Sequence, residues 1–170
     1  PALRTEREAL DVYRKLFPGD HPEVARIVNR IGFWLTEAGA YGEADRDLHE
    51  ALAMRQRLLG DDHPDVASSL THLAILQVAT GKYSQALESA RQAVNICVPA
   101  LSATHWRTAV AESAEGAALT GLGRYAEAQK LLLHSNGILG TGNAGAPVTY
   151  RRLAQHYMEQ LQSRRAAHAT

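Results

Sequence analysis

The sequence predicts an all-α fold, a right-handed α-solenoid built from antiparallel helix pairs. Two repeated motifs carry this prediction. Asp-His-Pro-Glu-Val-Ala at residues 20–25 returns as Asp-His-Pro-Asp-Val-Ala at residues 62–67, and Gly-x-Tyr-x-x-Ala occurs at residues 39–44, 81–86 and 123–128. Both motifs advance by 42 residues, and a fixed period of roughly 20–50 residues is typical of stacked repeats. A stacked array presents a long curved surface, so recognition of another polypeptide is the first functional expectation.

Each 42-residue unit is expected to hold two helices, A and B. The units are predicted at residues 22–60, 64–101 and 105–139. In the first A helix, apolar residues follow the spacing of one buried helical stripe: Val24, Val28, Ile31 and Leu35. Residues 3–17 are expected to form a B helix without its own A helix, because Glu-Ala-Leu at 8–10 matches Glu-Ala-Leu at 50–52.

The helix ends also repeat. The predicted N-caps of the A helices are residues of good capping type at equivalent places: Asp20, Asp62 and Thr104. The predicted C-terminal residues in left-handed conformation are Gly39, Gly81 and Gly123. Small residues that let helices A and B approach closely are expected at Ala44, Ala86 and Ala128. Pro99 lacks an N–H and is predicted to end the second B helix early, near Val98.

The chain after the third unit is expected to differ from the repeats. Residues 140–147 are rich in glycine and predict a flexible loop; they lack the Gly-x-x-x-x-Gly-Lys-Ser/Thr pattern of a phosphate-binding loop. Residues 148–163 predict a terminal capping helix, in a register that departs from the 42-residue step. The whole chain is thus read as one repeat domain.

Composition restricts the classes of function. Lys plus Arg and Asp plus Glu both number 18, so the basic excess typical of nucleic-acid binders is missing. The single cysteine, Cys97, permits no intrachain disulfide and fits a reducing compartment. No apolar run approaches the ~20 residues of a membrane span. We therefore expect a cytoplasmic protein with a protein or peptide ligand and no nucleic-acid or membrane partner.

The repeated motifs resemble the tetratricopeptide repeat array of the 42-residue type found in kinesin light chains. The resemblance covers nearly the whole chain. The third unit, His-Trp-Arg-Thr-Ala-Val-Ala at 105–111, is also similar to the last repeat of arrays at the C-terminal end of bacterial serine/threonine protein kinases. The resemblance implies a non-catalytic interaction module whose A helices line a concave groove for a peptide. In such arrays, helix-A asparagines reach the peptide backbone, and Asn29 matches one of them.

The 42-residue alignment predicts which side chains line this groove. Polar positions recur at Asn29, Thr71 and Ser113, and apolar positions at Phe33, Ile75 and Ala117. An extended peptide needs backbone partners and one or two apolar pockets. The predicted peptide-binding groove consists of Arg26, Asn29, Arg30, Phe33, Glu37, Ser68, Thr71, His72, Ile75 and Val78. The ligand is expected to carry an acidic residue near Arg26 and Arg30, and an apolar residue over Phe33 or Ile75.

Neither metal binding nor catalysis is predicted. The repeat-equivalent histidines, His21, His63 and His105, cannot converge on one ion, because packed helices lie ~8–10 Å apart and zinc ligands must come within ~2.1 Å of the metal. No Ser/His/Asp or Cys/His set is recognisable, so no enzyme, cofactor or metal is expected. Glu112 and Glu115 stand where the second unit has leucines. Either this face is open to water, or Arg91 or Arg124 compensates their charge.

Two alternative functions remain open from the sequence. The chain could be the regulatory C-terminal region of a bacterial signalling enzyme with a serine/threonine kinase-like catalytic domain elsewhere. It could also be a self-assembly module that forms a homodimer through exposed terminal helices, since the array is open at both ends.

Overall fold

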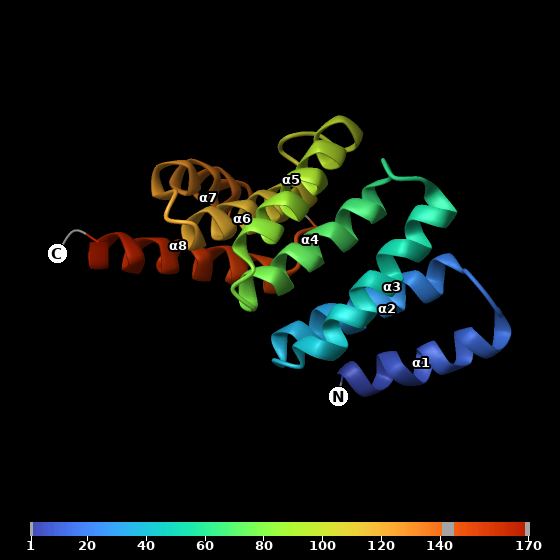
Figure 1. The fold of residues 1–170 in the computed structure, drawn as a ribbon. Helices are drawn as coiled ribbons and strands as arrows, with labels where there is room; N and C mark the ends of the chain where they lie inside the picture. The colour runs from blue at the N-terminus through green and yellow to red at the C-terminus, as the bar shows by residue number, and fades with distance from the viewer. Residues whose placement is uncertain (1, 141–144, 169–170) are drawn as a thin grey trace.

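The computed structural model describes residues 2–140 and 145–168, and these form helices joined by short connections (Figure 1). The helices are α1 (Ala2–Leu16), α2 (Pro22–Glu37), α3 (Tyr41–Leu59), α4 (Pro64–Ala79), α5 (Tyr83–Ala100), α6 (Trp106–Gly121), α7 (Tyr125–Gly140) and α8 (Val148–His168). No strand occurs in these two ranges, which confirms the all-α prediction. Within the same ranges, no helix combines the length and apolar character that a membrane crossing requires.

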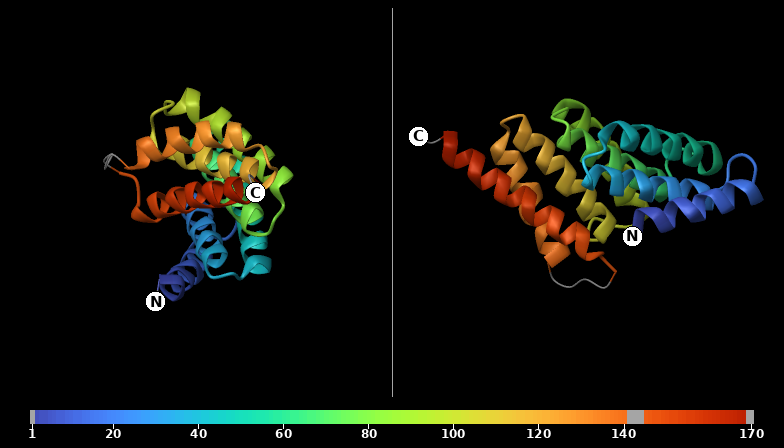
Figure 2. Two further views of the ribbon diagram at one scale, coloured as in Figure 1. Left: turned by 90° about the vertical axis from the view of Figure 1, so that its left-hand side faces the viewer. Right: turned by 90° about the horizontal axis from the view of Figure 1, so that it is seen from below.

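The helices form a curved stack with α1 and α8 at opposite ends (Figure 2). Helix pairs α2–α3, α4–α5 and α6–α7 make the most extensive contacts. Contacts also join α2 to α4, α4 to α6 and α6 to α8, whereas none joins α3 to α5 or α5 to α7. The A helices α2, α4 and α6 therefore form the inner, more tightly packed layer of a solenoid, and the B helices form the outer layer.

Helix α8 keeps the 42-residue step, so the prediction that it leaves the register is wrong. The inner helices begin at Pro22, Pro64, Trp106 and Val148, each 42 residues after the one before. Helix α8 contacts α6 and α7 just as α6 contacts α4 and α5. It is a fourth A helix, hidden in the sequence because the Asp-His-Pro motif does not precede it. It ends at His168, beyond the expected residue 163. Of the loop expected at 140–147, residues 141–144 lie outside the described residues.

The N-caps of α2, α4 and α6 are the repeated histidines and not the residues before them. The ring Nδ1 atoms of His21, His63 and His105 accept hydrogen bonds from the backbone N–H two residues further on, at 3.2, 3.1 and 3.1 Å. The backbone of these histidines is extended, as an N-cap requires. The predicted caps at 20, 62 and 104 lie one residue too early. The three histidines thus have a structural role at helix starts.

The predicted glycine ends are confirmed. Gly39, Gly81 and Gly123 have φ values of +78°, +75° and +76°. In each case the following N–H bonds to the carbonyl five residues back, the arrangement of a Schellman motif: Ala40 to Leu35, Lys82 to Gln77 and Arg124 to Leu119. Pro99 does not stop its helix early, since α5 continues to Ala100 and the Leu101 N–H still bonds to Cys97 at 2.8 Å.

Helices A and B of one repeat meet through complementary pairs of small and large residues. Ala44, Ala86 and Ala128 are fully buried, as expected. A Cβ on Gly32 would lie 2.6 Å from Leu48 Cγ, and a Cβ on Gly116 would lie 2.6 Å from Leu132 Cγ. At the equivalent positions of the second repeat stand Ala74 and Ala90, so the larger inner residue faces a smaller outer one.

This complementarity gives a stability prediction. Gly32→Ala should destabilise the fold by ~1–3 kcal/mol, because its methyl group overlaps Leu48. In a Leu48→Ala background, which recreates the pair of the second repeat, the same change should cost nothing further. Gly137→Ala is the control: it is helical with no atom within 4 Å of its Cβ, and should stabilise by about 0.5–1 kcal/mol. Denaturant melts measure all four variants, and equal costs of Gly32→Ala in both backgrounds would contradict the pairing.

Candidate functional site

A row of ring side chains crosses the inner face of the array. Phe33 from α2 lies 4.8 Å from His72 of α4 and 5.5 Å from Tyr150 of α8, measured between ring centroids. Trp106 of α6 stacks on Tyr150 at 5.8 Å. All four A helices are therefore joined by side-chain contacts at the middle of the concave face.

This row separates two clefts, and the predicted groove residues are divided between them. The first, of about 250 Å³, lies towards the N-terminal ends of α2, α4 and α6; we call it the arginine cleft. Six predicted residues line it: Arg26, Asn29, Arg30, Ser68, Thr71 and His72. The second cleft, of about 360 Å³, lies towards the opposite ends of these helices and is lined by three more: Glu37, Ile75 and Val78. The remaining residue, Phe33, belongs to the row between them.

Helix α8 accounts for this division, which the sequence did not predict. Tyr150 and Leu153 of α8 pack against a core cluster that contains Phe33 and Ile75. As a result, Phe33 is 5% exposed and Ile75 is 2% exposed. The apolar floor expected to receive a ligand is thus largely covered by the fourth A helix of the chain itself.

Three of the four arginines in the arginine cleft have carboxylate partners. Arg26 bonds to Glu23 at 2.6 Å, and Arg30 bonds to Glu6 of α1 at 2.5 Å. Arg107 of α6 approaches Asp65 of α4 at 3.4 Å. These pairs are half-exposed and close the rim of the cleft.

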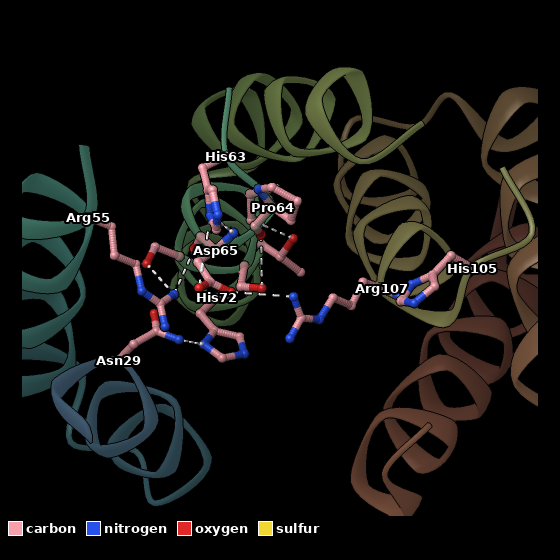
Figure 3. Close-up of polar contacts among 12 residues, drawn as sticks. Asn29, Arg55, His63, Pro64, Asp65, His72, His105 and Arg107 are labelled. Carbon is pink, nitrogen blue, oxygen red and sulfur yellow. Dashed lines mark hydrogen bonds and ion pairs between the residues drawn. The ribbon is translucent and has the colours of Figure 1, made fainter. Parts of the chain in front are cut away.

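The fourth arginine, Arg55 of α3, is buried and was not predicted. It is 6% exposed, and its Nη1 donates to the Asp65 carbonyl at 2.7 Å and to Ser69 Oγ at 3.0 Å. No carboxylate of the described residues lies within 4 Å of it. Figure 3 shows Arg55, Asn29, His72 and Arg107 converging from four helices. The 42-residue alignment could have identified Arg55, because it is the only charged residue at this position: the equivalent residues of the other B helices are Tyr13, Cys97 and Leu139.

A hydrogen-bonded chain connects the arginine cleft to the ring row. Asn29 Nδ2 lies 2.9 Å from His72 Nδ1, and His72 Nε2 lies 2.9 Å from the Tyr150 hydroxyl. With Asn29 as donor, Nδ1 accepts and the Nε2–H donates to Tyr150. Burial, with a smaller contribution from the charge of Arg55, lowers the pKa of His72 to about 3. Burial raises the pKa of Tyr150 to about 12, so both groups are neutral near pH 7.

Asn29 leaves one polar atom unpaired. Its side chain is 3% exposed, and Oδ1 has no hydrogen-bond partner in the described structure. The equivalent residues avoid this problem, since the hydroxyl groups of Thr71 and Ser113 donate to carbonyls of their own helices at 2.8 and 2.9 Å. An unpaired buried acceptor costs ~1–3 kcal/mol, so Asn29 is a candidate for ligand contact.

The second cleft has a mixed lining of apolar and polar side chains. Ile75 and Val78 of α4 and Leu153 of α8 line it, with Glu37 and Arg164 among its polar residues. Arg164 donates to the Tyr83 hydroxyl at 3.1 Å. The cleft therefore presents apolar and polar side chains together, with charges of both signs among them.

The two glutamates of α6 lie outside both clefts and are compensated from the B helices. Glu115, 9% exposed, bonds to Arg91 of α5 at 2.9 Å, so one of the two expected compensating arginines is confirmed. Arg124 bonds to Glu127 instead. Glu112 bonds to His134 of α7 at 2.7 Å. Among residues 2–140 and 145–168, no three His, Cys, Asp or Glu side chains are arranged to hold a metal ion.

Comparisons with known proteins agree with the fold. Residues 23–97 match the family model described as tetratricopeptide repeat. No curated protein sequence matches the chain. One similar solved structure is a crystal structure of nearly identical TPR-like repeats of a Podosopora anserina kinesin light chain. It superposes with a TM-score of 0.67 at 21% sequence identity, and the match covers 98% of this chain and 86% of that chain. A point variant of it gives 0.68 and 21%, with 99% and 87% coverage. At this identity, the likeness concerns the fold.

Acidification tests the neutral state of His72. The pKa is 6.5 for an ordinary histidine and about 3 in the native chain, so between these values only the unfolded chain takes up a proton. This residue should therefore lower the free energy of unfolding by up to about 1.4 kcal/mol per pH unit on acidification. We expect the stability advantage of the parent over His72→Gln, measured by urea melts, to shrink as the pH falls from about 6.5 to 4. An advantage independent of pH would show that folding leaves the pKa of His72 unchanged, and would contradict its lowering by burial.

Proposed function

We propose that the chain binds a peptide segment of a partner protein at its inner face and performs no chemistry itself. Residues 23–97 match the tetratricopeptide repeat model, and the fold is like that of kinesin-light-chain-type repeats. Tetratricopeptide repeats are in general protein–protein interaction modules. The single observation that supports the proposed site is the pair of clefts on the inner face, one lined by four arginines and one lined by a mixture of apolar and polar side chains.

The two clefts favour a ligand with two kinds of side chain. An acidic residue suits the arginine cleft, and an apolar residue suits the part of the second cleft beside the half-buried Val78 and Leu153. Arg26 and Arg30 already have the partners Glu23 and Glu6, so a ligand carboxylate would have to share them. Such half-exposed pairs contribute only ~0–1 kcal/mol each. We therefore expect contacts inside the two clefts, and not the exposed ion pairs, to supply most of the binding free energy of the peptide.

A blocking substitution tests this function. Peptides selected from a random library against the parent chain should bind Ser68→Trp at least tenfold more weakly, because the new ring fills the arginine cleft that Ser68 lines. Gln92→Trp adds the same ring to an exposed position of α5 in the outer layer, and should bind like the parent. Fluorescence anisotropy measures both. Equal affinity of the parent and Ser68→Trp would remove the inner face as the peptide site.

Self-association is a second candidate function, and the exposed apolar residues of α1 favour it. Val12 is 55% exposed and Leu16 is 64% exposed. At the other end, α8 exposes Val148 at 53%, but the outward positions that follow it are polar: Arg152, Gln155 and Glu159. Terminal faces of repeat arrays are normally polar, so the apolar end at α1 is the one suited to contact a second chain.

Sedimentation over a concentration series tests self-association through α1. If the parent dimerises, Leu16→Glu should shift it towards monomer, because burying the new carboxylate is unfavourable. Leu133→Glu on α7, which is exposed to a similar extent at 57%, should leave the equilibrium unchanged. A parent that stays monomeric at high concentration would reject this function.

A further inference from the structure

Arg55 is an exception to the repeat that packing does not explain. At the equivalent positions the other B helices have Tyr13, Cys97 and Leu139, and Cys97 and Leu139 are each 1% exposed. An apolar residue therefore fits this position in the same architecture. A buried guanidinium remains charged and is costly to bury without an opposite charge. The negative charge that acts on Arg55 is that of the Asp65 carboxylate, which also approaches Arg107 at 3.4 Å. The place of Arg55 at the wall of a cleft therefore calls for a further anion.

Charge counting around the arginine cleft leads to the same conclusion. Its four arginines meet three carboxylates: Glu23 beside Arg26, Glu6 beside Arg30 and Asp65 beside Arg107. The excess is one positive charge, and it remains with Arg55. A single carboxylate would balance it, whereas a doubly charged phosphate group would exceed it.

The Arg55 side chain is already oriented for such a contact. Its Nη1 is held by the Asp65 carbonyl and Ser69 Oγ, and no hydrogen bond occupies Nε or Nη2 in the described structure. Its fork of N–H groups matches a carboxylate, and desolvation strengthens that hydrogen bond. Since Tyr150 accepts from His72, its own O–H is also free to donate, and Tyr150 lines the same cleft.

Asn29 restricts the ligand further. It lines the same cleft, and its buried Oδ1 needs a donor. A simple carboxylic acid offers no N–H, but an amino-acid residue within or at the end of a peptide offers both groups. One peptide residue can therefore accept a hydrogen bond from Arg55 through its carboxylate and donate one to Asn29 Oδ1 through its N–H.

We propose that the arginine cleft binds one carboxylate-bearing peptide residue, whose carboxylate pairs with Arg55 and whose N–H donates to Asn29. The carboxylate belongs either to an acidic side chain or to a peptide C-terminus. This site deepens the proposed peptide-binding function and rests on it only for the source of the ligand. It differs from the predicted contact at Arg26 and Arg30, because the counter-charge comes from an outer helix and is buried.

Small probes test the site without a partner protein. The chain is titrated, under nuclear magnetic resonance observation, with N-acetylglycine for a C-terminal carboxylate and with N-acetylaspartate amide for a side-chain carboxylate. At least one should bind saturably and shift the Arg55 and Asn29 side-chain signals, and the tighter one identifies the source. Propionate, which lacks the N–H, should bind at least threefold more weakly, and N-acetylglycinamide, which lacks the carboxylate, should not bind.

Two variants in different helices remove the proposed contacts. Arg55→Met, close in volume and apolar like Cys97 and Leu139 at the equivalent positions, should weaken probe binding at least tenfold. Asn29→Asp keeps the side-chain size and cancels the excess positive charge, so it should have the same effect and remains informative if Arg55→Met does not fold. Arg46→Met, at an exposed position on the same helix as Arg55, is the matched control and should bind like the parent.

Three results would overturn the proposal. They are the absence of saturable carboxylate binding, inorganic phosphate binding more tightly than both carboxylates, and parent-like affinity in the folded variants of Arg55 and Asn29. Failure of this site can be distinguished from failure of the proposed peptide-binding function. Peptides blocked by Ser68→Trp but insensitive to Arg55→Met would reject this site and leave the proposed function intact.

Discussion

Close approach of helices A and B within each repeat is the constraint on which the rest of the array depends. The fully buried Ala44, Ala86 and Ala128 have no side chain beyond Cβ, and Gly32 and Gly116 make room for the leucines that face them. Because the pairs are held at one separation, successive inner helices contact one another while the outer helices do not. The curvature that creates an inner face is a consequence of this packing.

The same packing makes departures from the repeat informative. Most inward positions are apolar or small in every unit, so a charged residue there is retained against a desolvation cost. Glu115 and Glu112 offset this cost with Arg91 and His134 from the outer helices. Their role is complete within the fold. Arg55 bonds only to neutral oxygen atoms of Asp65 and Ser69, and the charge of the Asp65 carboxylate that acts on it is shared with Arg107. For this reason Arg55, and not the glutamate pair, directs attention to a ligand.

The ring row also connects stability with recognition. Asn29, His72 and Tyr150 form one hydrogen-bonded chain across three inner helices, and Phe33 and Trp106 pack on its rings. This arrangement holds α8 against the inner face. Burial, with a smaller contribution from the charge of Arg55, keeps His72 neutral, so the positive charge of the cleft resides on its arginines. The residues that close the middle of the groove therefore also set the polarity of the cleft beside it.

The sequence by itself determined the repeat, because a 42-residue period and glycines in left-handed conformation are local properties of the chain. The sequence also predicted the helix pairs and the small residues between them. Of the ten residues predicted to line the groove, nine line one of the two clefts. The histidine caps of α2, α4 and α6 are also local, since each ring nitrogen reaches an N–H two residues away, although the predicted caps lie one residue too early. Two features were decided only by the tertiary structure. Helix α8 completes the inner layer and divides the groove, because Tyr150 meets Phe33 from a distant part of the chain. Arg55 enters the cleft from an outer helix, because burial and the absence of a partner depend on the neighbours that packing brings to it.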